Sequence, residues 1–127
     1  MQVDLVLVLE QGDQIERRTG VRLAVRSGRP GAGTAAAIAL GTGLPGLPAP
    51  AAEGYFLEVT SVPAPRAAIS GADPRGLLYG VGRLLRSMEL RPGSIQAPPL
   101  SLVDAPRMRL RGAQLGYRPK PNAYDAW

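Results

Sequence analysis

Hydrophobic and polar positions along this chain follow two periods, one typical of strands and the other of helices. Residues 55–61 alternate with a period of two, which predicts a strand with two different faces. A turn containing Pro63 and Pro65 follows, and residues 66–70 then return as a second strand. The two strands are therefore expected to pair as a hairpin.

The clearest helix is predicted to begin directly after this hairpin. Asp73 suits the N-cap and Pro74 suits the first helical position. Apolar side chains then recur on one face: Leu77, Leu78, Val81, Leu84, Leu85 and Met88. Gly76 and Gly80 share a face and are expected to let the helix lie close to a sheet, and the proline–glycine pair at 92–93 is expected to end it.

The first 54 residues are patterned less clearly. Residues 3–19 fit one face of a helix that ends at Gly20, although their apolar first part would equally suit a buried strand. Residues 21–26 alternate and predict a strand with one wet face, and residues 35–40 predict a short buried strand. Residues 41–54 contain three prolines and predict a loop.

Two further strands are expected, at residues 100–103 and 108–117. With 127 residues, the chain has the length of one domain and is too short for a complete (β/α)8 barrel, which needs about 250 residues. The order of elements predicts an α+β fold, with two helices packed on one face of a mixed or mostly antiparallel sheet.

Composition removes several kinds of chemistry. The chain has neither Cys nor His, which excludes thiolate nucleophiles, disulfides and imidazole bases or ligands. No acidic residues are adjacent, and we expect neither a catalytic residue nor a metal site. Residues 41–46 match G-x-G-x-x-G, but the prolines that follow prevent the helix a dinucleotide site needs, so no cofactor is expected.

Positive charge is concentrated in the second half of the chain. Residues 1–63 carry five Arg and six acidic residues (−1), and residues 64–127 carry ten Lys or Arg and four acidic residues (+6), which sums to +5. On a strand, Arg107, Arg109 and Arg111 would share one face, which suits phosphate or sugar hydroxyls, or an exposed sheet edge. Because the cations are otherwise scattered, nucleic-acid binding is an alternative and not the favoured interpretation.

We recognise no targeting signal in the sequence, so the localisation stays open. The apolar run at 3–9 contains an acidic residue and has no basic residue before it, unlike a secretory signal peptide. No apolar stretch approaches the about 20 residues that span a bilayer, so no membrane association is expected.

Several passages resemble a known domain. They are R-T-G-V-R-L at 18–23, E-G-Y at 53–55, G-A-D-P-R-G-L-L-Y-G at 71–80 and D-A-P-R-M-R-L-R-G at 104–112. Over about residues 15–117 the chain resembles the domain that precedes the catalytic barrel in glycoside hydrolase family 20 β-hexosaminidases and family 67 α-glucuronidases. These patterns do not separate the two families.

This resemblance implies an accessory α+β domain at residues 1–104 and, at 105–127, a linker with the start of a barrel that performs the chemistry. The implied partners are that C-terminal (β/α)8 barrel and, through it, a carbohydrate substrate. Arg111 matches an arginine that hydrogen-bonds sugar hydroxyls in family 20, and Arg118 is a candidate for contacting an acidic sugar. Family 20 usually has an aspartate where this chain has Gly116.

The main hypothesis is therefore a non-catalytic domain of a glycoside hydrolase, present here as a fragment or a truncated reading frame. A free-standing basic module that binds nucleic acid or another polyanion is the alternative, and a complete small enzyme is the least favoured.

Overall fold

The computed structural model describes residues 5–28 and 36–113. The described part contains two helices, α1 (Leu5–Thr19) and α2 (Pro74–Ser87). Its strands, in chain order, are β1 (Ala37–Thr42), β2 (Tyr55–Thr60), β3 (Arg66–Gly71), β4 (Glu89–Arg91), β5 (Ser94–Gln96) and β6 (Leu100–Asp104). The predicted α+β class is confirmed.

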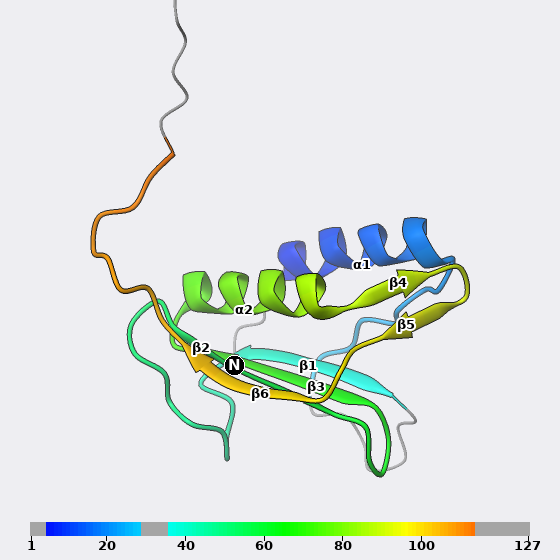
Figure 1. Ribbon diagram of the computed structural model, residues 1–127, viewed down its shortest axis with the longest axis horizontal. Helices are drawn as coiled ribbons and strands as arrows, with labels where there is room; N and C mark the ends of the chain where they lie inside the picture. Colours follow the sequence, from blue (N-terminus) through cyan, green and yellow to red (C-terminus); the bar gives the residue numbers. More distant parts are fainter. Residues whose placement is uncertain (1–4, 29–35, 114–127) are drawn as a thin grey trace, which may run out of the picture.

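Four strands form a mixed sheet in the order β1-β3-β2-β6 (Figure 1). The inner strands β2 and β3 pair antiparallel as the predicted hairpin, and β6 pairs antiparallel with β2. At the other edge, β1 pairs with β3 in parallel. Both helices lie on the same side of this sheet, where α2 packs directly on β2 and β3 and α1 contacts β4.

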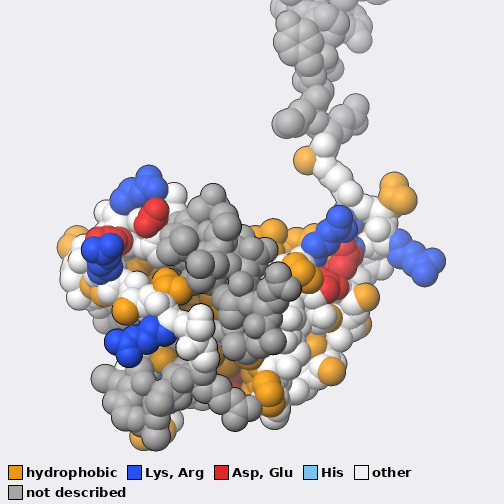
Figure 2. Space-filling view, turned by 180° about the vertical axis from the view of Figure 1, so that it is seen from behind, with side chains coloured by type: hydrophobic (Ala, Val, Ile, Leu, Met, Phe, Trp, Pro, Cys, Tyr) orange, Lys and Arg blue, Asp and Glu red, His pale blue; other side chains and the backbone are white. Residues whose placement is uncertain are grey.

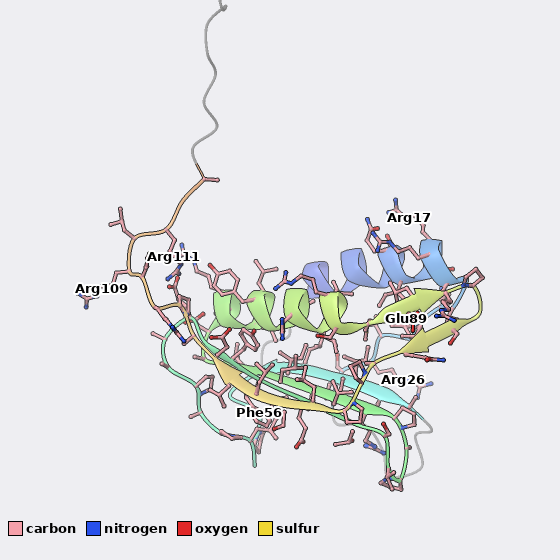
Figure 3. The ribbon with its side chains drawn as sticks, in the orientation of Figure 1. Arg17, Arg26, Phe56, Glu89, Arg109 and Arg111 are labelled. Carbon is pink, nitrogen blue, oxygen red and sulfur yellow. The ribbon has the colours of Figure 1, made fainter. Side chains whose placement is uncertain are left out.

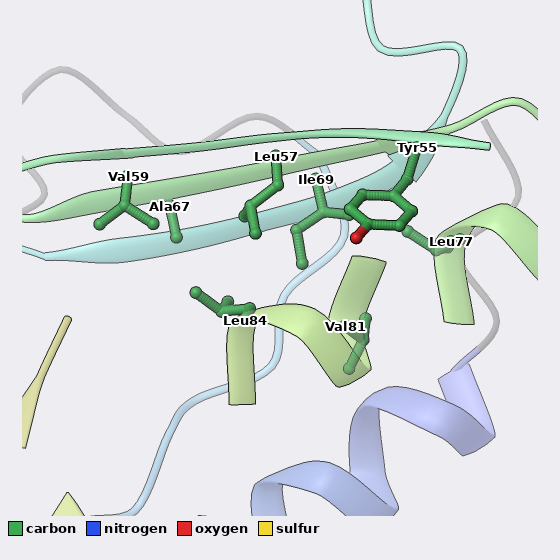
Figure 4. Packing of buried hydrophobic residues seen from close by; sticks show 8 residues of the cluster. All are labelled: Tyr55, Leu57, Val59, Ala67, Ile69, Leu77, Val81 and Leu84. Carbon is green, nitrogen blue, oxygen red and sulfur yellow. The ribbon is translucent and has the colours of Figure 1, made fainter. Parts of the chain in front are cut away.

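The hydrophobic core lies between α2 and the two inner strands. Alternate residues of the strands meet one stripe of the helix (Figure 4): Tyr55, Leu57, Val59, Ala67, Ile69, Leu77, Val81 and Leu84. Leu57 and Ile69 are 0% exposed. The period-two and helical patterns of the sequence thus meet in one packed layer, which is the main source of hydrophobic stabilisation.

Gly80 brings α2 close to the sheet. A Cβ at this position would lie 2.4 Å from Cγ2 of Ile69 and 3.1 Å from Cγ of Tyr55. Carbon atoms pack best at about 3.5–4.0 Å, so a side chain would force the helix away from the strands. The predicted role of Gly80 is confirmed, whereas Gly76 faces a loop, as described below.

α2 ends earlier than the sequence pattern predicts. It ends at Ser87, and the residues that follow form the antiparallel hairpin β4–β5. Gly93 has φ +74° between the two strands, so the Pro–Gly pair forms their turn and does not end the helix. The N–H of Gly93 donates to the carbonyl of Thr19 at 2.7 Å, which ties this hairpin to the end of α1.

The predicted first helix is confirmed. Gly20 follows α1 with φ +73°, and its N–H donates to the carbonyl of Glu16 at 2.7 Å. Ile15 is 3% exposed and gives the helix a buried contact. Glycine suits this position because its left-handed backbone carries no Cβ penalty.

Two predicted strands are wrong. Residues 21–26 are not part of a sheet, because alternation alone creates no strand without a neighbour to pair with. Residues 108–113 have no regular structure, and residues 114–117 of that predicted strand lie outside the described part. β1 runs from Ala37 to Thr42, later than predicted, and is mostly half-buried because it is an edge strand.

Candidate functional site

Three connections leave the mixed sheet at the same end. Thr42, at the end of β1, lies beside Gly71, at the end of β3, and Gly71 lies beside Tyr55, at the start of β2. Asp104, at the end of β6, pairs with Tyr55 from the other side. The β1–β2 loop, the β3–α2 turn and the outgoing segment, residues 105–113, therefore meet here, next to the start of α2 (Figure 1).

The β1–β2 loop lies directly on the first turn of α2. The N–H of Ala72 donates to the carbonyl of Gly54 at 2.9 Å. A Cβ on Gly76 would lie only 2.0 Å from that same carbonyl oxygen, and a Cβ on Gly54 would lie 2.9 Å from the Cβ of Ala105. Both glycines are required by the close approach of backbone to backbone and of the loop to the outgoing segment.

Asp73 joins the loop to the helix through both oxygens of its carboxylate. Oδ1 accepts the N–H of Gly76 at 2.8 Å, which confirms the predicted N-cap. Oδ2 accepts the N–H of Glu53 at 2.7 Å. Glu53 has φ +57°, a left-handed conformation that is uncommon without glycine, and this hydrogen bond helps to hold it.

The Glu53 carboxylate brings two arginines together. Nη1 of Arg75 donates to Oε1 at 2.8 Å, and Nη2 of Arg111 donates to Oε2. Nη1 of Arg111 also donates to the carbonyl of Met108. In Figure 3, Arg111 lies beside the start of α2, whereas Arg109 points away from the domain. We call Glu53, Arg75 and Arg111 the Glu53 cluster. Figure 2 shows acidic and basic side chains close together at the base of the outgoing segment.

The two arginines of the Glu53 cluster keep its carboxylate ionised. Hydrogen bonds from Arg111 and then Arg75 hold the pKa of the Glu53 carboxyl below its usual value. The same hydrogen bonds raise the pKa of both guanidinium groups. All three groups are therefore charged at neutral pH, and the carboxylate has no proton to donate.

Tyr55 lies at the border between this site and the core. The residue is 6% exposed, and burial, followed by the nearby charge of Asp104, raises the pKa of its hydroxyl. The hydroxyl donates to Oδ2 of Asp104 at a long 3.5 Å. Tyr55 thus stays neutral and acts as a core residue with a polar tip.

The predicted arginine stripe does not exist as a strand face. Residues 107–111 are irregular, so Arg109 and Arg111 point in different directions, and only Arg111 reaches the cluster. Its side chain is 32% exposed and already binds Glu53. Arg118 lies outside the described residues. Asp104 is the last residue of β6, and its Oδ1 accepts the N–H of Ala105 at 2.9 Å.

Sequence reasoning missed the role of Glu53, although it lies inside one of the quoted passages. Its sequence signal is weak, because one glutamate before a glycine and a strand has many explanations. The partner residues Arg75 and Arg111 are 22 and 58 positions away. Only the topology, which brings three connections to one end of the sheet, places them together.

Other features of the described residues offer less chemistry. A hollow of about 320 Å³ lies between α1 and residues 22–25. Across it, Nε of Arg22 lies 3.9 Å from Oε2 of Glu16, so these charges offset one another. Within residues 5–28 and 36–113, no group of three potential metal-ligating side chains occurs, and neither helix is long and apolar enough to cross a membrane.

Comparison with models of known protein families, with curated proteins and with solved structures gave no match to this chain.

Proposed function

We propose that residues 1–104 are the non-catalytic N-terminal domain of a carbohydrate-active glycoside hydrolase, hexosaminidase-like or α-glucuronidase-like. The domain stabilises and orients a following (β/α)8 barrel, and residues 105–127 form the linker and the start of that barrel. Carbohydrate is bound and cleaved by the barrel and not by this domain.

One observation carries this proposal: the outgoing segment is fastened back onto the domain. Arg111 lies several residues beyond the end of β6, the last strand. Its side chain nevertheless binds Glu53, which belongs to the β1–β2 loop. Ala105 packs beside Gly54 in the same loop. A domain whose work is to orient its neighbour needs its exit held in this way, because a free linker leaves relative domain motion as the default.

The chemistry of the site supports a structural role. The Glu53 carboxylate is held ionised by two guanidinium groups and shares its oxygens between them. A general acid needs the opposite environment, one that raises its pKa. Apolar side chains are exposed near the same end of the domain, with Val103 57%, Met108 72% and Leu110 94% exposed, which fits a surface covered by a further domain.

Arg111 remains our candidate for contacting sugar hydroxyls, and Arg118 remains a candidate for an acidic sugar. The guanidinium of Arg111 is partly exposed while it binds Glu53. Its planar fork has donors on two sides, so binding to one carboxylate oxygen leaves further N–H groups for a ligand.

A polyanion-binding module is the second candidate, and one observation favours it. α2 exposes three arginines along its length, with one exposed tyrosine among them: Arg75, Arg83, Arg86 and Tyr79. Basic and aromatic side chains together suit nucleic acid. Against this, Arg75 is already bound by Glu53.

The test is to compare the 127-residue chain with the natural open reading frame that contains it. We expect no hydrolysis of aryl glycosides by the chain alone, hydrolysis by the product of a frame that continues past Trp127, and a lower melting temperature of that product when residues 1–104 are removed. Hydrolysis by the 127-residue chain, or a frame too short for the about 250 residues of a barrel, would overturn the proposal. Nucleic-acid binding that weakens steeply with salt would favour the alternative.

A further inference from the structure

The outgoing segment touches the domain at two places. At its start, Ala105 lies against Gly54, and near its end, Arg111 binds Glu53. Between them the apolar side chains of Met108 and Leu110 are 72% and 94% exposed, so the intervening residues contribute little packing. The second attachment therefore depends on Arg111, which binds Glu53 and also has a side-chain hydrogen bond with Tyr79 of α2.

Glu53 is fixed independently of this segment. Its N–H is bound by Asp73 at 2.7 Å, and its Oε1 is bound by Arg75 at 2.8 Å. The next residue, Gly54, is held by its carbonyl, which accepts the N–H of Ala72 at 2.9 Å. The remaining oxygen, Oε2, is thus preorganised to accept an arginine from the outgoing segment.

We infer that Glu53 is a positioning residue that latches the outgoing segment through Arg111 and so fixes the direction in which the chain leaves the domain. A free segment of about nine residues would spread over about 15–18 Å, whereas a latched one is confined to a single path. That this path orients a catalytic barrel rests on the proposed function, but the latch itself does not.

The latch can be measured on the 127-residue chain as it stands. Since the chain has no Cys, cysteines introduced at Ser101, on β6, and at Ala113, beyond the latch, can carry two spin labels. Both positions are exposed. Double electron–electron resonance then reports how widely the distance between the labels is distributed.

We expect a narrow distribution for the otherwise unchanged chain and a distribution wider by roughly 10 Å for Glu53→Asn. Asparagine tolerates the left-handed backbone of this position and removes the charge. Arg111→Gln should broaden the distribution equally without touching the β1–β2 loop, so the test survives if Glu53→Asn fails to fold. Glu89→Gln, which breaks the Arg91 ion pair on β4, is the matched control and should leave the width unchanged.

A distribution that stays narrow in Arg111→Gln, or one that is already broad before substitution, would overturn the latch. Hydrolysis by the longer natural protein is measured separately, so the proposed function can fail while the latch stands. In that longer protein, Glu53→Asn should raise KM more than it lowers kcat, because Arg111 would be misplaced and not removed. Unchanged kinetics with a broadened distribution would overturn the sugar contact of Arg111 and leave the latch in place.

Discussion

Glu53 combines a left-handed backbone with a carboxylate shared by two guanidinium groups. The left-handed backbone is uncommon without glycine, and at this position the carboxylate lies within reach of Arg75, at the start of α2, and of Arg111. The neighbouring Gly54 and Gly76 let the loop come close enough for Asp73 to bind it. At the scale of single residues, the site therefore rests on backbone geometry as much as on charge.

The environment of Glu53 predicts a pH dependence. Because its pKa in the folded chain lies below the unfolded value, the cluster contributes stability above the unfolded pKa and loses it as the pH falls through the folded pKa. A carboxyl-carbon NMR titration should give Glu53 a midpoint below that of an ordinary glutamate. Since Arg111 is the largest cause, Arg111→Gln should raise this midpoint, and identical midpoints in the two proteins would refute the assignment.

Gly76 gives a sharper prediction at the same scale. Gly76→Ala should destabilise the fold by about 1–3 kcal/mol or more, because its Cβ would meet the carbonyl of Gly54. Gly82→Ala, in the same helix, is the control: its Cβ would meet only the flexible end of Arg86 at 3.5 Å, so a gain of about 1 kcal/mol is expected. Urea unfolding measures both, and equal stabilities would contradict the close approach.

At the scale of elements, β2, β3 and α2 form a continuous stretch of chain that carries the core. Like β3, β2 has neighbours on both edges and α2 on one face. Its central residue Leu57 is 0% exposed. The other elements attach around this unit: β1 and β6 at its edges, and the β4–β5 hairpin after α2.

We expect Leu57→Ala to cost about 2–5 kcal/mol, since it removes a completely buried side chain. This is a large part of the about 5–15 kcal/mol that stabilises a typical domain. Leu78→Ala changes the same residue type at a position that is 43% exposed on α2 and should cost far less. Thermal unfolding measures both variants. Equal falls in their unfolding midpoints would contradict the difference in burial between Leu57 and Leu78.

The elements that sequence predicted well are those with a local physical signature. Alternation placed β2, the return of the chain after the proline turn placed β3, and the Asp73 cap and apolar stripe placed α2. The false strand at 21–26 has the same alternation, and only the absence of a pairing strand separates it from the true ones. The parallel pairing of β1 and the meeting of Glu53 with Arg111 depend on contacts distant in sequence, which local patterns do not encode.

At the scale of the whole molecule, the labelled arginines are spread apart, whereas the loops that connect the strands and α2 meet at one end of the sheet. The net charge is +5, but in Figure 3 Arg17 and Arg26 lie far from Arg109 and Arg111. These four arginines thus lie in two separate parts of the described domain. The connections, by contrast, gather at one end of the sheet, next to the outgoing segment.

The crossing of Gly54 and Gly76 limits how this sequence can change over evolutionary time. The atom that a side chain at Gly76 would strike is a main-chain carbonyl oxygen, which every amino acid carries. No replacement of residue 54 can remove that obstacle, so a harmful substitution at Gly76 has no second-site suppressor at its contact partner. The core position Leu57, surrounded by side chains that can change volume, can be compensated by its neighbours. Drift in this domain should therefore repack its core more freely than it alters the place where two stretches of backbone touch.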